Sequence, residues 1–276
     1  MAVPIYDNHV HLNPEGRNVD ALRAFEAAGG TGLTLVTLPY REVPVSSGED
    51  FSRSFRITLS LAERGREATG LKINVAVGPY PVLIIPLAEH YGLERAERIM
   101  KEGMEAAARL VAEGKADAIG EVGRPHFTVD PEISEASDRV LIRGMELASE
   151  IGCPVMIHSE SEPHTYSDLK RMAGTACLDP GRVIKHSSRP LVTESETSGI
   201  MPSIPASRTA VREALAKGNR FMLETDYIDD PGNPSAVMSI NTVPKRIKAM
   251  TASGEMSVED VHRICGEIPE RLYGFR

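Results

Sequence analysis

The stretch Tyr6-Asp-Asn-His-Val-His-Leu12 follows a short apolar run near the beginning of the sequence. Successive side chains of a β-strand point to opposite faces, so this pattern places Asp7, His9 and His11 on one face and the apolar residues on the other. Two imidazoles about 7 Å apart on one face can bind a single cation. Taken alone, the pair is equally compatible with ordinary polar residues at the end of a strand.

Short apolar runs of this kind recur along the sequence and alternate with helical patterns. Helical periodicity is present, for example, at residues 20–28, 93–113 and 134–151, and the last helix is expected to begin at Ser134 as N-cap and to stop at Gly152. Ser257-Val-Glu-Asp260 resembles a capping box that opens a C-terminal helix. The predicted strands comprise residues 3–9, 33–38, 71–77, 116–122, 154–158, 182–186, 199–204 and 221–225.

Eight strands that alternate with helices in 276 residues predict an α/β fold, a (β/α)₈ TIM barrel that forms one domain over residues 1–276. A doubly wound open sheet is the alternative. It is disfavoured because neither GxGxxG nor GxxxxGK[ST] follows any predicted strand. No linker rich in Gly, Ser or Pro divides the sequence.

The composition, with 41% hydrophobic and 25% charged residues, is ordinary for a globular protein. The net charge of −8 argues against a broad basic surface for nucleic acid. Cys153, Cys177 and Cys265 form no CxxC motif, which indicates reduced thiols rather than a disulfide framework. Without a leader pattern or a long apolar run, we expect a cytoplasmic protein with no membrane contact, in an oligomeric state that the sequence leaves open.

Four more predicted strands end in residue types that bind metals. Glu121, His158 and His186 each stand where an apolar run stops, and Asp226 follows the run 221–225. A single histidine at such a position is more often a core or rim residue than a ligand. The carboxyl ends of barrel strands converge on one mouth, however, so the repeated pattern predicts one common site.

Neutral imidazoles and carboxylates together suit divalent metals such as Zn, Mn or Mg. The predicted metal ligands are His9, His11, Glu121, His158, His186 and Asp226. Six ligands exceed the shell of one tetrahedral zinc ion, so we expect two divalent metal ions bridged by Glu121. Such a pair supports hydrolysis by an activated water, and Asp226 is the candidate to accept its proton.

These motifs, in this order, resemble those of the TatD-type metal-dependent hydrolases of the amidohydrolase superfamily. The matching segments are Asp7-Asn-His-Val-His-Leu12, Ile119-Gly-Glu-Val-Gly123, Pro154-Val-Met-Ile-His-Ser159, Lys185-His-Ser187 and Leu223-Glu-Thr-Asp226. The resemblance implies a TIM barrel with a dinuclear divalent site. It also implies phosphodiester hydrolysis, typically by a Mg²⁺-dependent deoxyribonuclease.

Three departures from the family pattern lie beside the motifs. Arg124-Pro-His-Phe127 stands where Leu-Asp-Tyr is usual, and Ser187-Ser188 stands in place of an aromatic residue and a Gly. Glu160 occupies a position where an Arg is usual, and that Arg would grip phosphate with its guanidinium fork. The candidate substrate contacts are Arg124, His126, Glu160, His164 and Lys185.

We therefore expect a metal-dependent hydrolase of phosphodiesters, with DNA ends or short oligonucleotides as substrate. A small-molecule amidohydrolase, lactonase or phosphoesterase on the same dinuclear site is the alternative, and a metal-binding scaffold without catalysis is the third hypothesis. Asp7 is expected to fix the tautomer of a ligating histidine, and Glu224 to form a salt bridge with a neighbouring helix. Residues 227–234 are expected to form a turn-rich loop beside the site.

Overall fold

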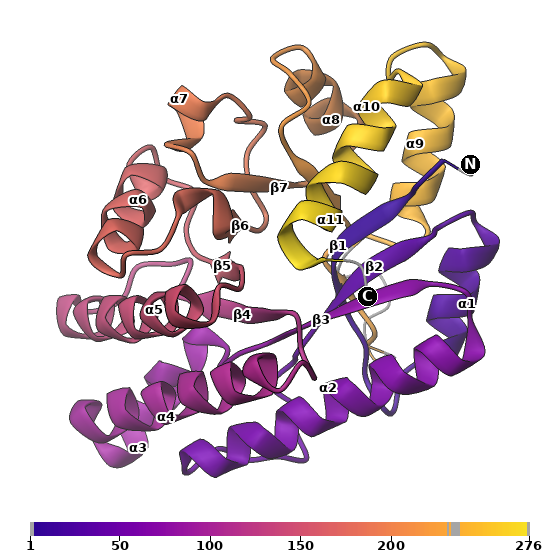
Figure 1. Cartoon of the computed structure of the whole chain (residues 1–276). Helices are drawn as coiled ribbons and strands as arrows, with labels where there is room; N and C mark the ends of the chain where they lie inside the picture. Colours follow the sequence, from indigo (N-terminus) through magenta and orange to yellow (C-terminus); the bar gives the residue numbers. More distant parts are fainter. Residues whose placement is uncertain (1–2, 231, 233–237, 275–276) are drawn as a thin grey trace.

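Apolar strands and amphipathic helices alternate along the chain and close into a (β/α)₈ TIM barrel, as the sequence predicts (Figure 1). The computed structural model describes residues 3–230, 232 and 238–274. The strands are β1 (Tyr6–His11), β2 (Gly32–Val36), β3 (Lys72–Val77), β4 (Ala118–Gly123), β5 (Val155–His158), β6 (Val183–Lys185), β7 (Met201–Pro205), β8 (Met222–Glu224) and β9 (Tyr227–Ile228). The α-helices are α1 (Val19–Ala27), α2 (Gly48–Ala68), α3 (Ile84–Tyr91), α4 (Leu93–Ala112), α5 (Pro131–Ile151), α6 (Thr165–Thr175), α7 (Glu194–Thr197), α8 (Arg208–Leu215), α9 (Thr242–Ala252), α10 (Val258–His262) and α11 (Ile268–Tyr273). Short 3₁₀ turns lie at η1 (Pro81–Leu83) and η2 (Pro180–Arg182), and η3 (Arg263–Glu267) is a π-helical turn.

The strands form one parallel sheet in the order β8-β7-β6-β5-β4-β3-β2-β1-β9. The helices surround the strands in chain order, from α1 and α2 to α9 and α10 (Figure 1). Apolar side chains on the outer face of the sheet share one buried cluster with this ring, which includes Leu33 and Leu35 of β2 and Leu22 and Phe25 of α1, all fully buried. Because every strand runs in the same direction, the residues that end the strands meet at one mouth.

The last strand of the barrel is divided into two short segments, β8 and β9, and each segment pairs with a different neighbour. β8 ends at Glu224 and pairs with β7, whereas β9 begins at Tyr227 and pairs with β1. Between them Asp226 has a φ of 51°, a left-handed conformation that Asp adopts more readily than most residues. The expected loop at 227–234 therefore begins as a strand, and its residues 231, 233 and 234 lie outside the described chain.

Asp7 spans this break. Its Oδ1 accepts the backbone N–H of Thr225 at 3.0 Å, and its Oδ2 accepts the Thr225 hydroxyl at 2.7 Å. Asp7 pairs with Leu33 of β2 but Val10 pairs with Leu35, so β1 contains one extra residue, a β-bulge that interrupts the expected alternation. The prediction that Asp7 fixes a histidine tautomer is therefore wrong, because its carboxylate binds Thr225 and the backbone of β1 instead.

The expected helix ends are partly confirmed. Gly152 ends α5 in the left-handed conformation, and Ser257 and Asp260 form the capping box that opens α10. The N-cap predicted at Ser134 is wrong: α5 begins at Pro131, whose fixed φ and missing N–H suit the first turn of a helix. The backbone N–H of Ser134 already bonds within that turn, to the carbonyl of Asp130 at 3.1 Å.

The opposite end of the barrel is covered by the C-terminal helix. The hydroxyl of Tyr273 in α11 donates to Asn8 Oδ1 at 2.6 Å, and its ring stacks on Tyr6 with the ring centroids 6.4 Å apart. The three side chains are buried. Among the described residues, no helix is both long and apolar enough to cross a bilayer.

We expect Asp7→Ala to lower the free energy of unfolding by about 1–3 kcal/mol, because it leaves two buried donors of Thr225 without an acceptor. Asp20→Ala, which removes a surface ion pair with Arg23 on α1, is the control and should change stability by less than about 0.5 kcal/mol. Urea unfolding of the metal-free proteins measures both. Equal stability of Asp7→Ala and the unmodified chain would contradict the closing role of Asp7.

Candidate metal centre and active site

The six predicted metal ligands converge at the mouth of the barrel. His9 and His11 belong to β1, Glu121 to β4 and His158 to β5. His186 directly follows β6, and the left-handed backbone at Asp226 lies between β8 and β9. All of them except His158 and Asp226 are buried, and the side chain of Asp226 is 36% exposed.

A first group of donor atoms surrounds the two histidines of β1. The Nε2 atoms of His9 and His11 lie 3.0 Å apart. Glu121 reaches them with Oε2 at 3.6 Å from His9 and Oε1 at 3.9 Å from His11. Asp226 Oδ1 lies 3.8 Å from His9 Nε2 and 3.6 Å from His11 Nε2. Four side chains thus direct nitrogen or oxygen lone pairs at one volume.

A second group shares Glu121 with the first. Glu121 Oε2 lies 3.2 Å from His158 Nδ1 and 3.3 Å from His186 Nε2, and these two nitrogens are 3.1 Å apart. Nearby donor atoms form three sets among the described residues: His9, His11 and Glu121; Glu121, His158 and His186; and His9, His186 and Glu224. The Glu121 carboxylate belongs to the first two sets and so joins the two groups.

Two of the imidazoles are held by a partner behind the site. His11 Nδ1 donates to the backbone carbonyl of Val36 at 3.0 Å, and His186 Nδ1 lies 3.3 Å from Glu224 Oε1. Glu224 is fully buried and also accepts from Ser187 N–H and the Ser203 hydroxyl. The predicted salt bridge from Glu224 to a helix is therefore wrong. Sequence reasoning missed this supporting role, although Glu224 lies only two residues before Asp226.

The electrostatics of the site are dominated by burial and by the mutual attraction of imidazoles and carboxylates. Burial opposes ionisation of Glu121, but the hydrogen bond from His158 and the charge of His186 outweigh it and hold the pKa of Glu121 well below its usual range. Burial likewise opposes ionisation of Asp226, yet the hydrogen bond from His11 and the charge of His9 lower the pKa of Asp226 to about 2.

His186 is affected in the opposite direction. Burial disfavours its charged form, but the nearby carboxylates, first of all Glu224, raise the pKa of His186 to about 9. Burial and the charge of His186 lower the pKa of His9 well below its usual range. In the metal-free centre, the imidazolium of His186 and the carboxylates of Glu121 and Asp226 therefore stabilise one another's charged forms.

The donor set fits divalent cations. His9 Nδ1 is a buried polar atom without a hydrogen-bond partner among the described residues, and its Nε2 faces the other ligand atoms. Neutral imidazole nitrogens and carboxylate oxygens are the donors that divalent cations prefer in proteins, and here they lie close enough together to share a cation.

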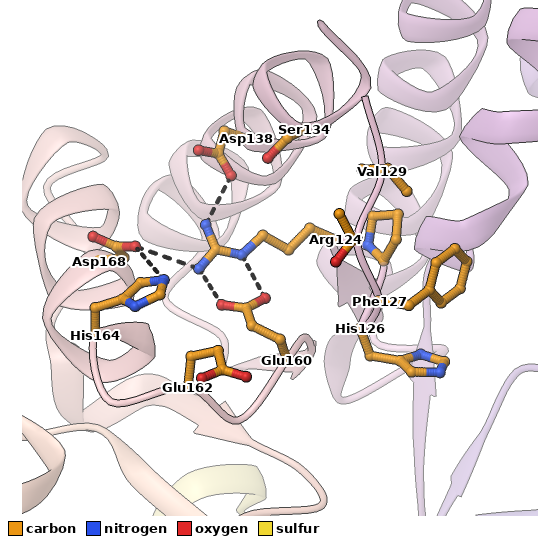
Figure 2. A pocket seen from close by; sticks show the side chains of 12 residues that line it. Arg124, His126, Phe127, Val129, Ser134, Asp138, Glu160, Glu162, His164 and Asp168 are labelled. Carbon is orange, nitrogen blue, oxygen red and sulfur yellow. Dashed lines mark hydrogen bonds and ion pairs between the residues drawn. The ribbon is translucent and has the colours of Figure 1, made fainter. Parts of the chain in front are cut away.

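A pocket of about 450 Å³ lies beside the centre, between the segments that follow β4 and β5 (Figure 2). Arg124 lies in its wall. Its guanidinium donates to Glu160 at 2.9 and 2.5 Å and to Asp138 at 3.1 Å, and Asp168 lies 3.6 Å away. Arg124 and Glu160, both candidate substrate contacts, therefore bind each other.

The remaining candidate contacts occupy different surroundings. His126 lines the pocket and its Nδ1 lies 2.8 Å from His158 Nε2. His164 is 63% exposed at the pocket rim, 3.9 Å from Asp168. Lys185 is buried and its Nζ donates to the backbone carbonyl of His186 at 2.7 Å. Contact of any of these residues with a substrate stays a prediction.

Comparison with known proteins agrees with this geometry. The sequence pattern of the family described as TatD related DNase matches residues 6–274. An uncharacterized protein of Methanocaldococcus jannaschii is 33% identical over 276 residues, which cover 99% of this chain and 96% of that protein. Among solved structures, the TatD homologue YjjV of Escherichia coli has a TM-score of 0.70 at 17% identity, with both chains covered completely. The organophosphorus hydrolase of Deinococcus radiodurans has a TM-score of 0.68 at 16% identity, over 99% of this chain and 93% of that chain.

A parallel barrel with clustered imidazoles and carboxylates at its mouth defines a metal-dependent hydrolase. Within that class, the chain belongs to the TatD related DNase family.

Binding of a divalent cation to the metal-free protein should release a proton near neutral pH. His186 is protonated below its pKa of about 9, and a metal binds only the neutral imidazole. Apparent affinity should therefore rise about tenfold per pH unit up to about pH 9 and then level off. Calorimetric titration at pH 7 in two buffers of different ionisation enthalpy measures the number of protons released. Titration at about pH 10, where His186 is already neutral, is the control for protons that come from metal-bound water. Absence of proton release at pH 7 would contradict a charged His186.

Proposed function

We propose that this protein hydrolyses phosphodiester bonds with the help of two divalent cations. One observation supports two cations rather than one: the carboxylate of Glu121 belongs to both donor groups, and its oxygens face histidines on either side. A single tetrahedral ion would leave part of this set unused. The proposed ligands are His9, His11, Glu121, His158, His186 and Asp226.

The bound cations, Mg²⁺, Mn²⁺ or Zn²⁺, would supply a Lewis acid that lowers the pKa of water and stabilises negative charge on the phosphoryl oxygens. The protein contributes a fixed arrangement of donors. His11 and His186 are each held from behind, by the carbonyl of Val36 and by Glu224, so their Nε2 lone pairs stay directed at the centre. The ligands are thus in place before substrate arrives.

Asp226 is the proposed proton acceptor for the attacking water. Its low pKa keeps it ionised at neutral pH, and its side chain is more exposed to the mouth than that of Glu121. In the proposed step, a water oxygen forms a bond to phosphorus, its proton passes to an Asp226 oxygen, and the ester oxygen leaves with the bonding electron pair. Family membership favours DNA ends or short oligonucleotides as the source of the diester.

A second candidate function is hydrolysis of a small ester, such as a phosphotriester or a lactone, on the same centre. The surroundings of Arg124 favour it, because three carboxylates contact the guanidinium that a phosphate backbone would otherwise bind (Figure 2). Glu162 adds another acid to the same pocket. The barrel shared with an organophosphorus hydrolase is compatible with such a substrate.

Hydrolysis of bis-p-nitrophenyl phosphate with each of the three metals tests the proposed function. We expect metal-dependent turnover that Asp226→Asn lowers about 10²- to 10⁴-fold, because it removes the proton acceptor. Asp230→Asn, in the same segment but outside the donor groups, is the matched control and should keep its activity. Bound metal is measured in every variant. Full activity of Asp226→Asn would refute its role, and inactivity of the unmodified, metal-loaded chain on every ester would support a scaffold without catalysis.

The charge of the pocket should affect a polyanionic substrate more than a small one. We expect Glu162→Gln to raise kcat/KM for a single-stranded oligonucleotide about twofold at low salt, because it removes one negative charge from the lining of the pocket. The effect should disappear at about 0.5 M salt and be smaller for bis-p-nitrophenyl phosphate, which carries a single negative charge. Glu132→Gln, an exposed acid of α5 outside the pocket, is the control. A response that persists at high salt would contradict an electrostatic effect of the pocket.

A further inference from the structure

The imidazoles at the mouth differ in which ring nitrogen faces the centre and in which group contacts the other nitrogen. His11 and His186 use Nδ1 to contact Val36 O and Glu224, which leaves Nε2 for the centre. His158 has the opposite orientation: its Nδ1 faces Glu121 Oε2 at 3.2 Å and His186 Nε2 at 3.1 Å. Its Nε2 therefore points away from the centre and needs its own partner.

His126 is that partner. Its Nδ1 lies 2.8 Å from His158 Nε2, and the two rings meet edge to face with centroids 4.9 Å apart. A cation held by Nδ1 of His158 requires the lone pair of that nitrogen, so the ring proton must reside on Nε2. The Nε2–H group then donates to the lone pair on Nδ1 of His126.

We propose that His126 is a positioning residue that fixes the ring and the tautomer of His158 for metal binding. It would do for His158 what the Val36 carbonyl and Glu224 do for the other two histidines. The inference rests on the proposed metal centre, and it gives His126 a role beyond the substrate contact expected from the sequence.

The backbone conformation at the end of β4 allows His126 to lie next to His158. Gly123 pairs with His158 across β4 and β5 and has a φ of 143°, and a Cβ on it would lie 2.0 Å from the His158 carbonyl oxygen. Only glycine permits this approach. The N–H of Arg124 then donates to the same carbonyl at 3.0 Å.

The side chain of Arg124 clamps the two segments together. Its bidentate bond to Glu160 joins the residues after β4 to those after β5, and Asp138 holds it from α5 (Figure 2). Arg124 is 8% exposed, so the clamp is largely shielded from water. The clamp places His126, two residues further on, over His158. The unusual residues Arg124, His126 and Glu160 thus form one assembly.

Metal titration of the metal-free protein with Mn²⁺ and Zn²⁺, followed by calorimetry, tests the proposal. We expect His126→Leu to weaken one of the binding events about 10- to 100-fold, because His158 loses its acceptor. His126→Asn should restore the affinity to within about threefold, since the amide oxygen can take the position of Nδ1. His164→Leu, a histidine of the same pocket without contact to a proposed ligand, should bind as the unmodified protein does.

An unchanged metal affinity of His126→Leu would overturn the proposal. An equally large loss of metal affinity in His126→Asn would also overturn it, because keeping a hydrogen-bond acceptor at this position would then have no effect. Circular dichroism confirms that each variant is folded. These outcomes differ from a failure of the proposed function. In that case two cations would bind with the expected dependence on His126, but the protein would cleave no phosphodiester.

A double-mutant cycle tests the clamp. Arg124→Leu should weaken the same binding event about 3- to 10-fold when His126 is present, and much less when His126 is already Leu. Equal effects of Arg124→Leu in both backgrounds would show that Arg124 does not act through His126, and would remove the clamp from the proposal.

Discussion

The contact between Asp7 and Thr225 is the constraint on which the rest of the mouth depends. A barrel has no free edge only if its first and last strands meet, and here the last strand is broken between β8 and β9. The carboxylate of Asp7 supplies two acceptors at that break. The left-handed residue that follows, Asp226, is thereby directed to the two histidines of β1.

The site is a compromise between burial and charge. Buried carboxylates and imidazoles are costly unless each has a partner, and in this mouth the partners are mainly one another. Behind them, polar groups such as the Val36 carbonyl, Glu224 and His126 satisfy the remaining nitrogens. These partners offset the free-energy cost of burying the charged groups. They also leave the lone pairs of the centre directed inward, where a cation can bind them.

The eight predicted strands and the convergence of the six candidate ligand residues could be obtained from the sequence, because apolar runs that end in His, Glu or Asp mark the carboxyl ends of barrel strands. The predictions that were wrong concern residues whose roles depend on tertiary contacts. The extra residue in β1 redirects Asp7, and no local pattern distinguishes a bulge from regular alternation. Pairing of Arg124 with Glu160 joins residues 36 positions apart, so each appeared separately as a departure from the family pattern. Glu224 was misjudged because its partner lies on the neighbouring segment after β6.

The distance along the chain between the residues that close the barrel has a consequence for biosynthesis. Asp7 bonds to a residue 218 positions later, and Asn8 to one 265 positions later. During synthesis, the strand with the first two histidines therefore keeps one edge unpaired until the segment from Thr225 to Tyr273 has emerged. A nascent chain cannot assemble the complete centre before that point, so a cation can bind the complete centre only afterwards.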